Sequence, residues 1–151
     1  MASARENDLN PNITIGLSFP LRGDAFNDFA MTKNSLEQAE HNLKNLLLTH
    51  IGERVNQPQF GSRLRALCFE QINDELPMRV EEEVNRAVGV WLPYINIHEV
   101  NTLTEEDDKS KIFVRIEYST IRCWWGSYTR KLLVGIYNGT YKYKKKYGKT
   151  S

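Results

Sequence analysis

Three acidic residues are the candidates for bond-breaking chemistry in this sequence: Glu53, Glu70 and Asp74. Two carboxyl groups about 5–5.5 Å apart support retaining glycoside hydrolysis, and a separation of about 6.5–9.5 Å supports inverting hydrolysis. Glu70 and Asp74 are four residues apart in a segment predicted to be helical, so they would share a helix face. That spacing is common on solvated helices, and the charge of Arg54 beside Glu53 disfavours a proton donor there. Glycoside hydrolysis is therefore the alternative interpretation.

Other catalytic and ligand-binding patterns are absent from the sequence. The histidines His41, His50 and His98 have no metal-ligand spacing, and Cys68 and Cys123 form no CxxC pair. The sequence also lacks a GxSxG nucleophile motif, a phosphate-binding loop and a dinucleotide fingerprint. We therefore expect no catalytic residue, no metal site and no cofactor, and we expect the cysteines to be free thiols in a reducing compartment.

Size and charge limit the class of protein. The chain has 151 residues, which fits one domain, and 40% of them are hydrophobic, which is typical of a globular fold. Twenty basic and nineteen acidic residues leave a net charge of +1, which disfavours a dedicated nucleic-acid or membrane-surface binder. No apolar run is long enough to cross a bilayer, and the N-terminus lacks the apolar stretch of a secretory signal.

Three helices are predicted from the spacing of apolar residues. The first begins at a capping box of Asn34 and Glu37 and ends at Gly52, the second begins with Ser62 as its cap, and the third opens at Pro77. The predicted inward-facing residues are Leu36, Ala39, Leu43, Leu46, Leu47 and Ile51 in the first helix, Leu64, Leu67, Cys68 and Ile72 in the second, and Val80, Val84, Ala87, Val88 and Trp91 in the third.

Alternating apolar residues predict strands at both ends of the chain. We expect a short strand at 13–20, a hairpin at 95–121 with an acidic tip at 104–110, and a last strand at 131–137. The fold class is therefore α+β: an N-terminal strand and three helices packed on a small, mostly antiparallel C-terminal sheet. Such a sheet has open edges that can accept a strand from another chain, and we expect 131–137 or the hairpin strand 111–121 to supply that edge.

The domain organisation is predicted as three parts. Residues 1–12 form a flexible N-terminal arm, 13–139 form the single domain, and 140–151 form a basic tail that holds five lysines and no acidic residue. Tyrosines alternate with these lysines, which would suit base stacking and phosphate contact. A solvated terminus is the interpretation that we favour, and the tail's partner stays open.

The segment 52–61 is predicted to be an irregular loop between two helices. It begins and ends with a glycine, and it contains a charged pair, a proline and a phenylalanine. Loops of this kind on a rigid scaffold are often recognition elements. The alternative is that Phe60 fills the local core and that Glu53 and Arg54 form an exposed ion pair, which would contribute about 0–1 kcal/mol.

A succession of short motifs runs through the first helix and this loop. The sequence contains, in order, NLKNLLLT at 42–49, GERV at 52–55, Pro58, FGS with Leu64 at 60–64, and FE at 69–70. This succession resembles the baseplate wedge family of contractile-tailed bacteriophages. Members of the family are often labelled lysozyme-like, and the family is related to a baseplate component of type VI secretion systems. The order of elements is similar over residues 13–137, and the basic tail has no counterpart.

The resemblance implies a structural role in the virion tail baseplate, assembled in the host cytoplasm, rather than an enzyme. It implies contacts with other wedge proteins and with the tail sheath protein, whose first ring would add strands to the sheet, and possible contacts with tube or hub proteins. Glu53, Arg54 and Pro58 would contact the helical core bundle of the wedge, and Phe60 and Gly61 would shape the loop. The family's fuller motif is Glu-Pro-Arg, whereas this chain has Glu53 followed directly by Arg54.

Overall fold

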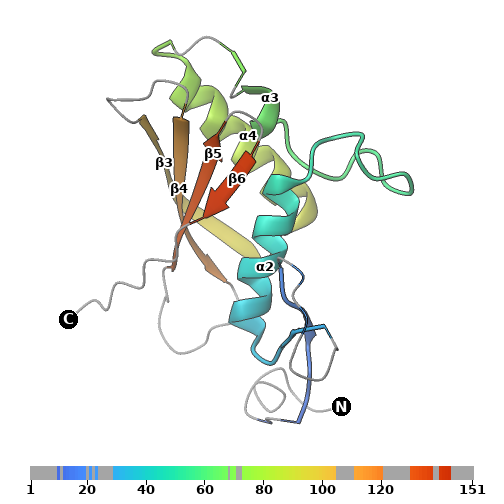
Figure 1. The fold of residues 1–151 in the computed structure, drawn as a ribbon. Coiled ribbons are helices and arrows are strands. Elements are labelled where there is room, and N and C mark those ends of the chain that lie inside the picture. Colours follow the sequence, from blue (N-terminus) through green and yellow to red (C-terminus); the bar gives the residue numbers. More distant parts are fainter. Residues whose placement is uncertain are drawn as a thin grey trace, which may run out of the picture. The chain divides into compact units, whose positions relative to one another are not determined.

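The computed structural model describes residues 10, 12–19, 21, 23, 29–67, 69–70, 73–104, 111–120, 130–137 and 140–143 (Figure 1). The chain divides into two compact units, residues 1–45 and 46–151, whose boundary falls inside helix α2 (Ser35–Leu48). Compactness does not establish independent folding, so the single domain at 13–139 stays a prediction. The predicted arm at 1–12 lies almost wholly outside the described residues.

The first unit contains a two-stranded ladder and most of α2. Strand β1 (Gly16–Leu17) pairs antiparallel with β2 (Met31–Thr32). The strand predicted at 13–20 is thus much shorter than expected, and β2 was missed because its two residues show no period. The amide of Leu36 donates to Asn34 Oδ1 at 2.8 Å, which confirms the predicted cap of α2.

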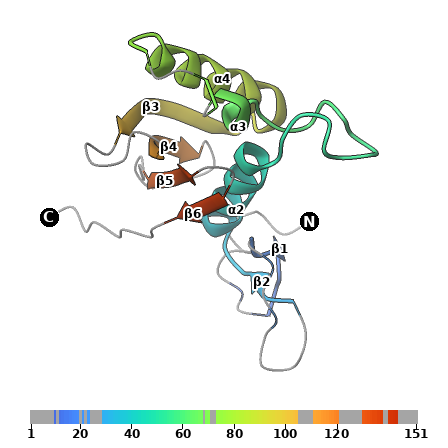
Figure 2. The same ribbon diagram turned by 45° about the horizontal axis from the view of Figure 1, so that its top comes forward.

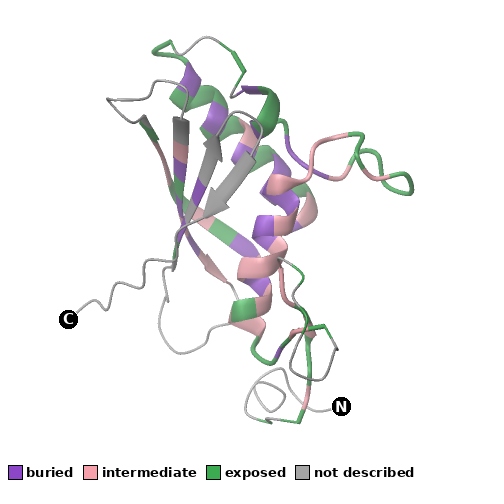
Figure 3. Cartoon of the chain, in the orientation of Figure 1, coloured by how far each residue is buried: buried purple, intermediate pink, exposed green. Residues whose placement is uncertain are grey.

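Two further helices lie in the second unit. Helix α4 (Leu76–Trp91) carries Pro77 in its first turn, as predicted. Helix α3 (Leu64–Leu67) is a single turn, so the longer helix predicted from Ser62 is wrong. Ser62 is not its cap, because the hydroxyl of Ser62 donates instead to the carbonyl of Leu47 at 2.8 Å. The buried apolar residues of these helices are Leu64, Leu67, Leu76, Val80, Val84, Ala87 and Val88 (Figure 3).

The second unit also holds a four-stranded antiparallel sheet, in the order β3 (Ile95–Thr104), β4 (Lys111–Thr120), β5 (Arg130–Tyr137) and β6 (Thr140–Tyr143). Helix α4 packs against β3, over one face of the sheet (Figure 2). The buried sheet residues include Ile95, Val114, Ile116, Tyr118, Leu132 and Val134. In β4 and β5 these residues alternate along each strand, and Val114 faces Val134 across the ladder, so they form one apolar face.

The sheet confirms the hairpin at 95–121 and the strand at 131–137, although residues 105–110 of the acidic tip lie outside the described part. It also corrects two predictions. Residues 140–143, expected in a solvated tail, form β6 and continue the sheet, whereas 144–151 lie outside the described residues. The hairpin strand expected at an edge, β4, is central, because it lies between β3 and β5. Strand β5 lies between β4 and β6, but β6 pairs with it only along Val134–Tyr137. Among the described strands of this sheet, β3 and β6 are the outer ones.

Candidate protein-binding loop

The loop at residues 52–61 is closed by hydrogen bonds at its base. The amide of Gly52, whose φ is +91°, donates to the carbonyl of Pro58 at 2.7 Å. Glu53 bonds to His50 twice: its carboxylate oxygen Oε2 accepts from the His50 amide at 2.9 Å, and its own amide donates to the His50 carbonyl at 3.1 Å. These bonds pair backbone groups just beyond the end of α2, so the start of the loop has a defined conformation.

The end of the loop is fixed by close backbone packing. Gly61 has a φ of +124°, and a Cβ atom there would lie 2.5 Å from the carbonyl oxygen of Thr49. The next amide, that of Ser62, donates to the same Thr49 oxygen at 2.9 Å. Only glycine combines this backbone conformation with so close an approach. The glycine of the FGS motif is therefore a structural requirement of the loop.

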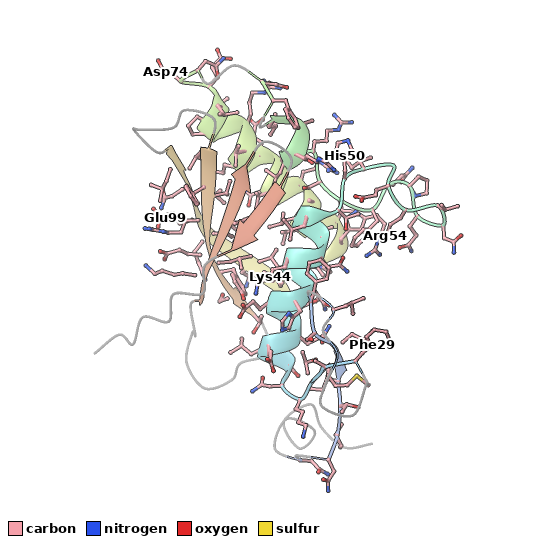
Figure 4. The ribbon with its side chains drawn as sticks, viewed as in Figure 1. Phe29, Lys44, His50, Arg54, Asp74 and Glu99 are labelled. Atoms are coloured by element: carbon pink, nitrogen blue, oxygen red, sulfur yellow. The ribbon has the colours of Figure 1, made fainter. Side chains whose placement is uncertain are left out.

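A chain of three side chains determines the direction of Arg54. The guanidinium carbon of Arg54 lies 3.8 Å from the centre of the Phe60 ring, and Phe60 makes an edge-to-face contact with Trp91 at a centroid distance of 5.2 Å. Cation–π contacts contribute about 0.5–1 kcal/mol at exposed sites. Phe60 thus packs against Trp91 of α4 and against the half-buried Arg54, a second contact that was not predicted. Figure 4 labels Arg54 on the loop and His50 before it.

The part of the loop between these contacts is exposed to solvent. Pro58 is exposed, as are Asn56, Gln57 and Gln59, and the side chain of Val55 is 96% exposed (Figure 3). The five residues that the sequence assigned to a binding site thus lie in one loop. Glu53, Pro58 and Gly61 take part in the contacts that close it, and Phe60 lies between Trp91 and Arg54. Glu53 and Pro58 are exposed, and Arg54 is half-buried. Sequence reasoning placed Trp91 only in a core stripe and missed it as the support of Phe60.

A polar network connects the segment after the loop to α4. The amide of Arg63 donates to Glu83 Oε1 at 2.7 Å, and Arg86 donates to both oxygens of that carboxylate at 2.7 and 2.9 Å. Burial of Glu83 would raise its pKa, but the hydrogen bonds and charges of Arg86 and Arg63 outweigh burial, so the pKa is lowered from its usual 4.5. The ionised carboxylate of Glu83 therefore holds the segment after the loop against α4.

The carboxylates considered for glycoside hydrolysis do not form a pair on one helix. Helix α3 ends at Leu67, so Glu70 and Asp74 share no helical face, and that prediction is wrong. Both oxygens of Glu70 accept from Arg79, one of them from Nη2 at 3.1 Å, and both side chains are exposed. Within the described residues no group of three or more His, Cys, Asp or Glu side chains could hold a metal ion. No helix in that part of the chain is long and apolar enough to cross a membrane.

Solved structures resemble this fold over most of the chain. A Geobacter sulfurreducens protein described as a candidate tail lysozyme is 28% identical, with a TM-score of 0.62, and the match covers 72% of this chain and 96% of that one. A chain of the anti-feeding prophage baseplate is 21% identical, with a TM-score of 0.63 and coverages of 73% and 87%. A chain of the type VI secretion baseplate complex is 12% identical, with a TM-score of 0.53 and coverages of 64% and 87%. Among curated proteins, none matches this chain.

These likenesses define the class of fold: an α+β fold shared with chains of the anti-feeding prophage baseplate and of the type VI secretion baseplate complex. The family described as "Baseplate wedge protein gp25" matches residues 34–122, more than half of the chain and the whole of the 52–61 loop. The chain belongs to this family, and it is a structural component of a contractile-tail baseplate.

Proposed function

We propose that this chain binds other wedge proteins through the 52–61 loop and starts assembly of the tail sheath by accepting a strand at the edge of its sheet. The observation that carries the first part is the position of Arg54, held over Phe60 on a closed and exposed loop. A planar guanidinium in a fixed direction suits recognition of carboxylates or backbone carbonyls, because it can donate two parallel hydrogen bonds. Less side-chain entropy is lost when such a group is already oriented.

The experiment is a binding measurement with full-length chain and wedges purified from tail assemblies that lack it. Arg54→Ala should abolish association while the circular dichroism and thermal unfolding of the isolated chain stay unchanged. Arg65→Ala is the matched control, because Arg65 is an exposed arginine on α3, outside the loop. Wild-type binding by Arg54→Ala would refute the loop as the binding site.

Strand addition needs an outer strand, and the β6 side of the sheet suits it better than β3. Strand β3 has an irregular register between Ile97 and Glu99, and such bulges protect an edge against pairing. Strand β6 pairs only with Val134–Tyr137 of β5, so residues 130–133 of β5 have no described neighbour on that side. We propose that a sheath strand adds on this side of the sheet. It would pair either with β6 or, in line with β6, with residues 130–133 of β5.

Glycoside hydrolysis is the second candidate, because the Geobacter relative is described as a candidate tail lysozyme. Hydrolysis would need one carboxyl group that donates a proton and a second placed across the scissile bond. Here Glu53 Oε2 accepts from the His50 amide, and both Glu70 oxygens accept from Arg79. Glu53 and Glu70 thus have structural partners, which favours the binding function over hydrolysis.

A further inference from the structure

Residues of the 52–61 loop differ in whether their side chains make a contact within the described part of the chain. Glu53 uses Oε2 to accept from the His50 amide. Phe60 is half-buried against Trp91, and Gly61 is buried against the backbone of Thr49. Val55, in contrast, is 96% exposed, more than any other large apolar side chain in the described part of the chain. Within the described residues, burial does not account for an apolar side chain at this position.

We propose that Val55 is the residue of this loop that enters the partner, and that the partner surface is an apolar pocket on another baseplate component. Glu53 is then a positioning residue, which acts through His50 and not by contact with the partner. This inference rests on the proposed function of the loop, and it names the chemistry that the loop recognises.

The conformation of the loop favours Val55 as an anchor. Two contacts fix the backbone around Val55. The Gly52 amide bonds to the Pro58 carbonyl, and the preceding residue, Arg54, is held over the Phe60 ring. A β-branched side chain has few rotamers to lose on binding, so burial of valine costs little entropy. At 96% exposure nearly all of its apolar surface is still available for burial against a partner.

The residues around Val55 fit the usual anatomy of a binding site. Asn56 and Gln57 follow it and are exposed polar residues. An apolar centre with a polar rim is the usual arrangement of a protein–protein interface. The loop thus offers one apolar group at its centre, with Arg54 and the amides around it.

The role of Glu53 can be separated from a charge contact by its chemistry. Glutamine keeps a side-chain oxygen that can accept from the His50 amide, whereas alanine removes the acceptor. A positioning role therefore predicts that Glu53→Gln behaves like the wild type and that Glu53→Ala does not. A charge contact with the partner predicts that both variants bind equally weakly.

The test is the dissociation constant of full-length variants for wedges purified from assemblies that lack this chain. Val55→Ala should weaken binding about tenfold, since two methyl groups leave the pocket. Val55→Thr should weaken it to a similar extent, because the shape is kept while a hydroxyl enters an apolar site. Gln59→Ala, an exposed control in the same loop, and Glu53→Gln should both bind within about twofold of the wild type.

Two results would overturn this inference. Wild-type affinity of Val55→Thr would exclude an apolar pocket, and equal losses in Glu53→Gln and Glu53→Ala would make Glu53 a contact residue. Arg54→Ala distinguishes a failure of the inference about Val55 from a failure of the proposed function of the loop. If it weakens binding while the Val55 variants do not, only the inference about Val55 fails. If no loop variant weakens binding, the proposed function of the loop fails with it.

Discussion

A Cβ atom on Gly61 would lie 2.5 Å from the carbonyl oxygen of Thr49, a separation that side chains do not tolerate. This contact joins the last residues of the loop to the end of α2. The chain therefore enters and leaves the loop at almost the same point. The loop's exposed residues project from a closed base, which is how a short segment can present a binding surface without its own core.

Gly61→Ala should lower the free energy of unfolding by about 2–4 kcal/mol, because it adds a steric clash to an unfavourable positive φ. Gly52→Ala is the matched control. Gly52 also has a positive φ, +91°, but no atom lies within 4 Å of its Cβ position, so we expect a cost of about 1 kcal/mol. Urea denaturation would measure both. Equal costs would show that backbone packing at Gly61 does not hold the loop.

The network at Glu83 predicts a dependence of stability on pH. The pKa of Glu83 is lower in the folded chain than its usual value of 4.5. A lowered pKa contributes stability above the unfolded pKa, and that contribution is lost as the pH falls through the folded pKa. Unfolding free energies measured from pH 6 to pH 3 should therefore fall, and Glu83→Gln should show a shallower fall. If the unfolding free energy of the variant falls as steeply between pH 6 and pH 3 as that of the wild type, Glu83 is not the source of the fall.

The contact between Arg54 and Phe60 predicts that charge alone does not replace arginine. Arg54→Lys keeps the positive charge but loses the planar group that lies against the ring, so its association with the wedge should weaken about tenfold. Its thermal unfolding should change little, because an exposed cation–π contact contributes only about 0.5–1 kcal/mol. Full binding by the lysine variant would mean that the partner recognises only the positive charge at position 54.

Proline scanning can test the edge of the sheet. Alternate residues of an outer strand direct their amides toward the neighbouring strand and toward the open side. Of Tyr141→Pro and Lys142→Pro, one should therefore disturb the pairing of β6 with β5, and the other should remove only a donor from the open edge. The variant that folds normally should allow tubes to form but not sheaths. Normal sheathed tails from both variants would contradict strand addition at β6 and would favour β3 as the edge instead.

The sequence predicted the elements with strong periodicity and missed those determined by tertiary contacts. Helix α4 and the β3–β4 hairpin follow from repeated apolar residues and were predicted well. Helix α3 covers only Leu64–Leu67, and Ser62, which was predicted to cap it, bonds instead to Leu47, fifteen positions away, a contact that no local pattern encodes. The sequence did not predict strand β6, because its lysine placed the segment in the basic tail. Backbone pairing with β5 does not depend on an apolar side chain.

The candidate site shows the same division. The five loop residues could be proposed from residue types and a family resemblance, and the structure brings all of them together. Their individual contacts could not be proposed, because these include the hydrogen bond from His50 to Glu53 and the packing of Phe60 against Trp91.

A test with peptidoglycan addresses the alternative function. Purified chain and the variants Glu53→Gln and Glu70→Gln should release soluble fragments at the same background rate, since both carboxylates accept hydrogen bonds within the chain. Turnover that depends on either glutamate would support hydrolysis instead.

Photo-crosslinking from Gln57 in assembled baseplates tests the central claim most directly, because its side chain is exposed on the loop and can carry a photoreactive analogue without disturbing the base. The account predicts a cross-link to another wedge protein from this position, and none from the same analogue at Glu82, an exposed residue of α4. Intact baseplates in which position 57 reaches no other protein would contradict it.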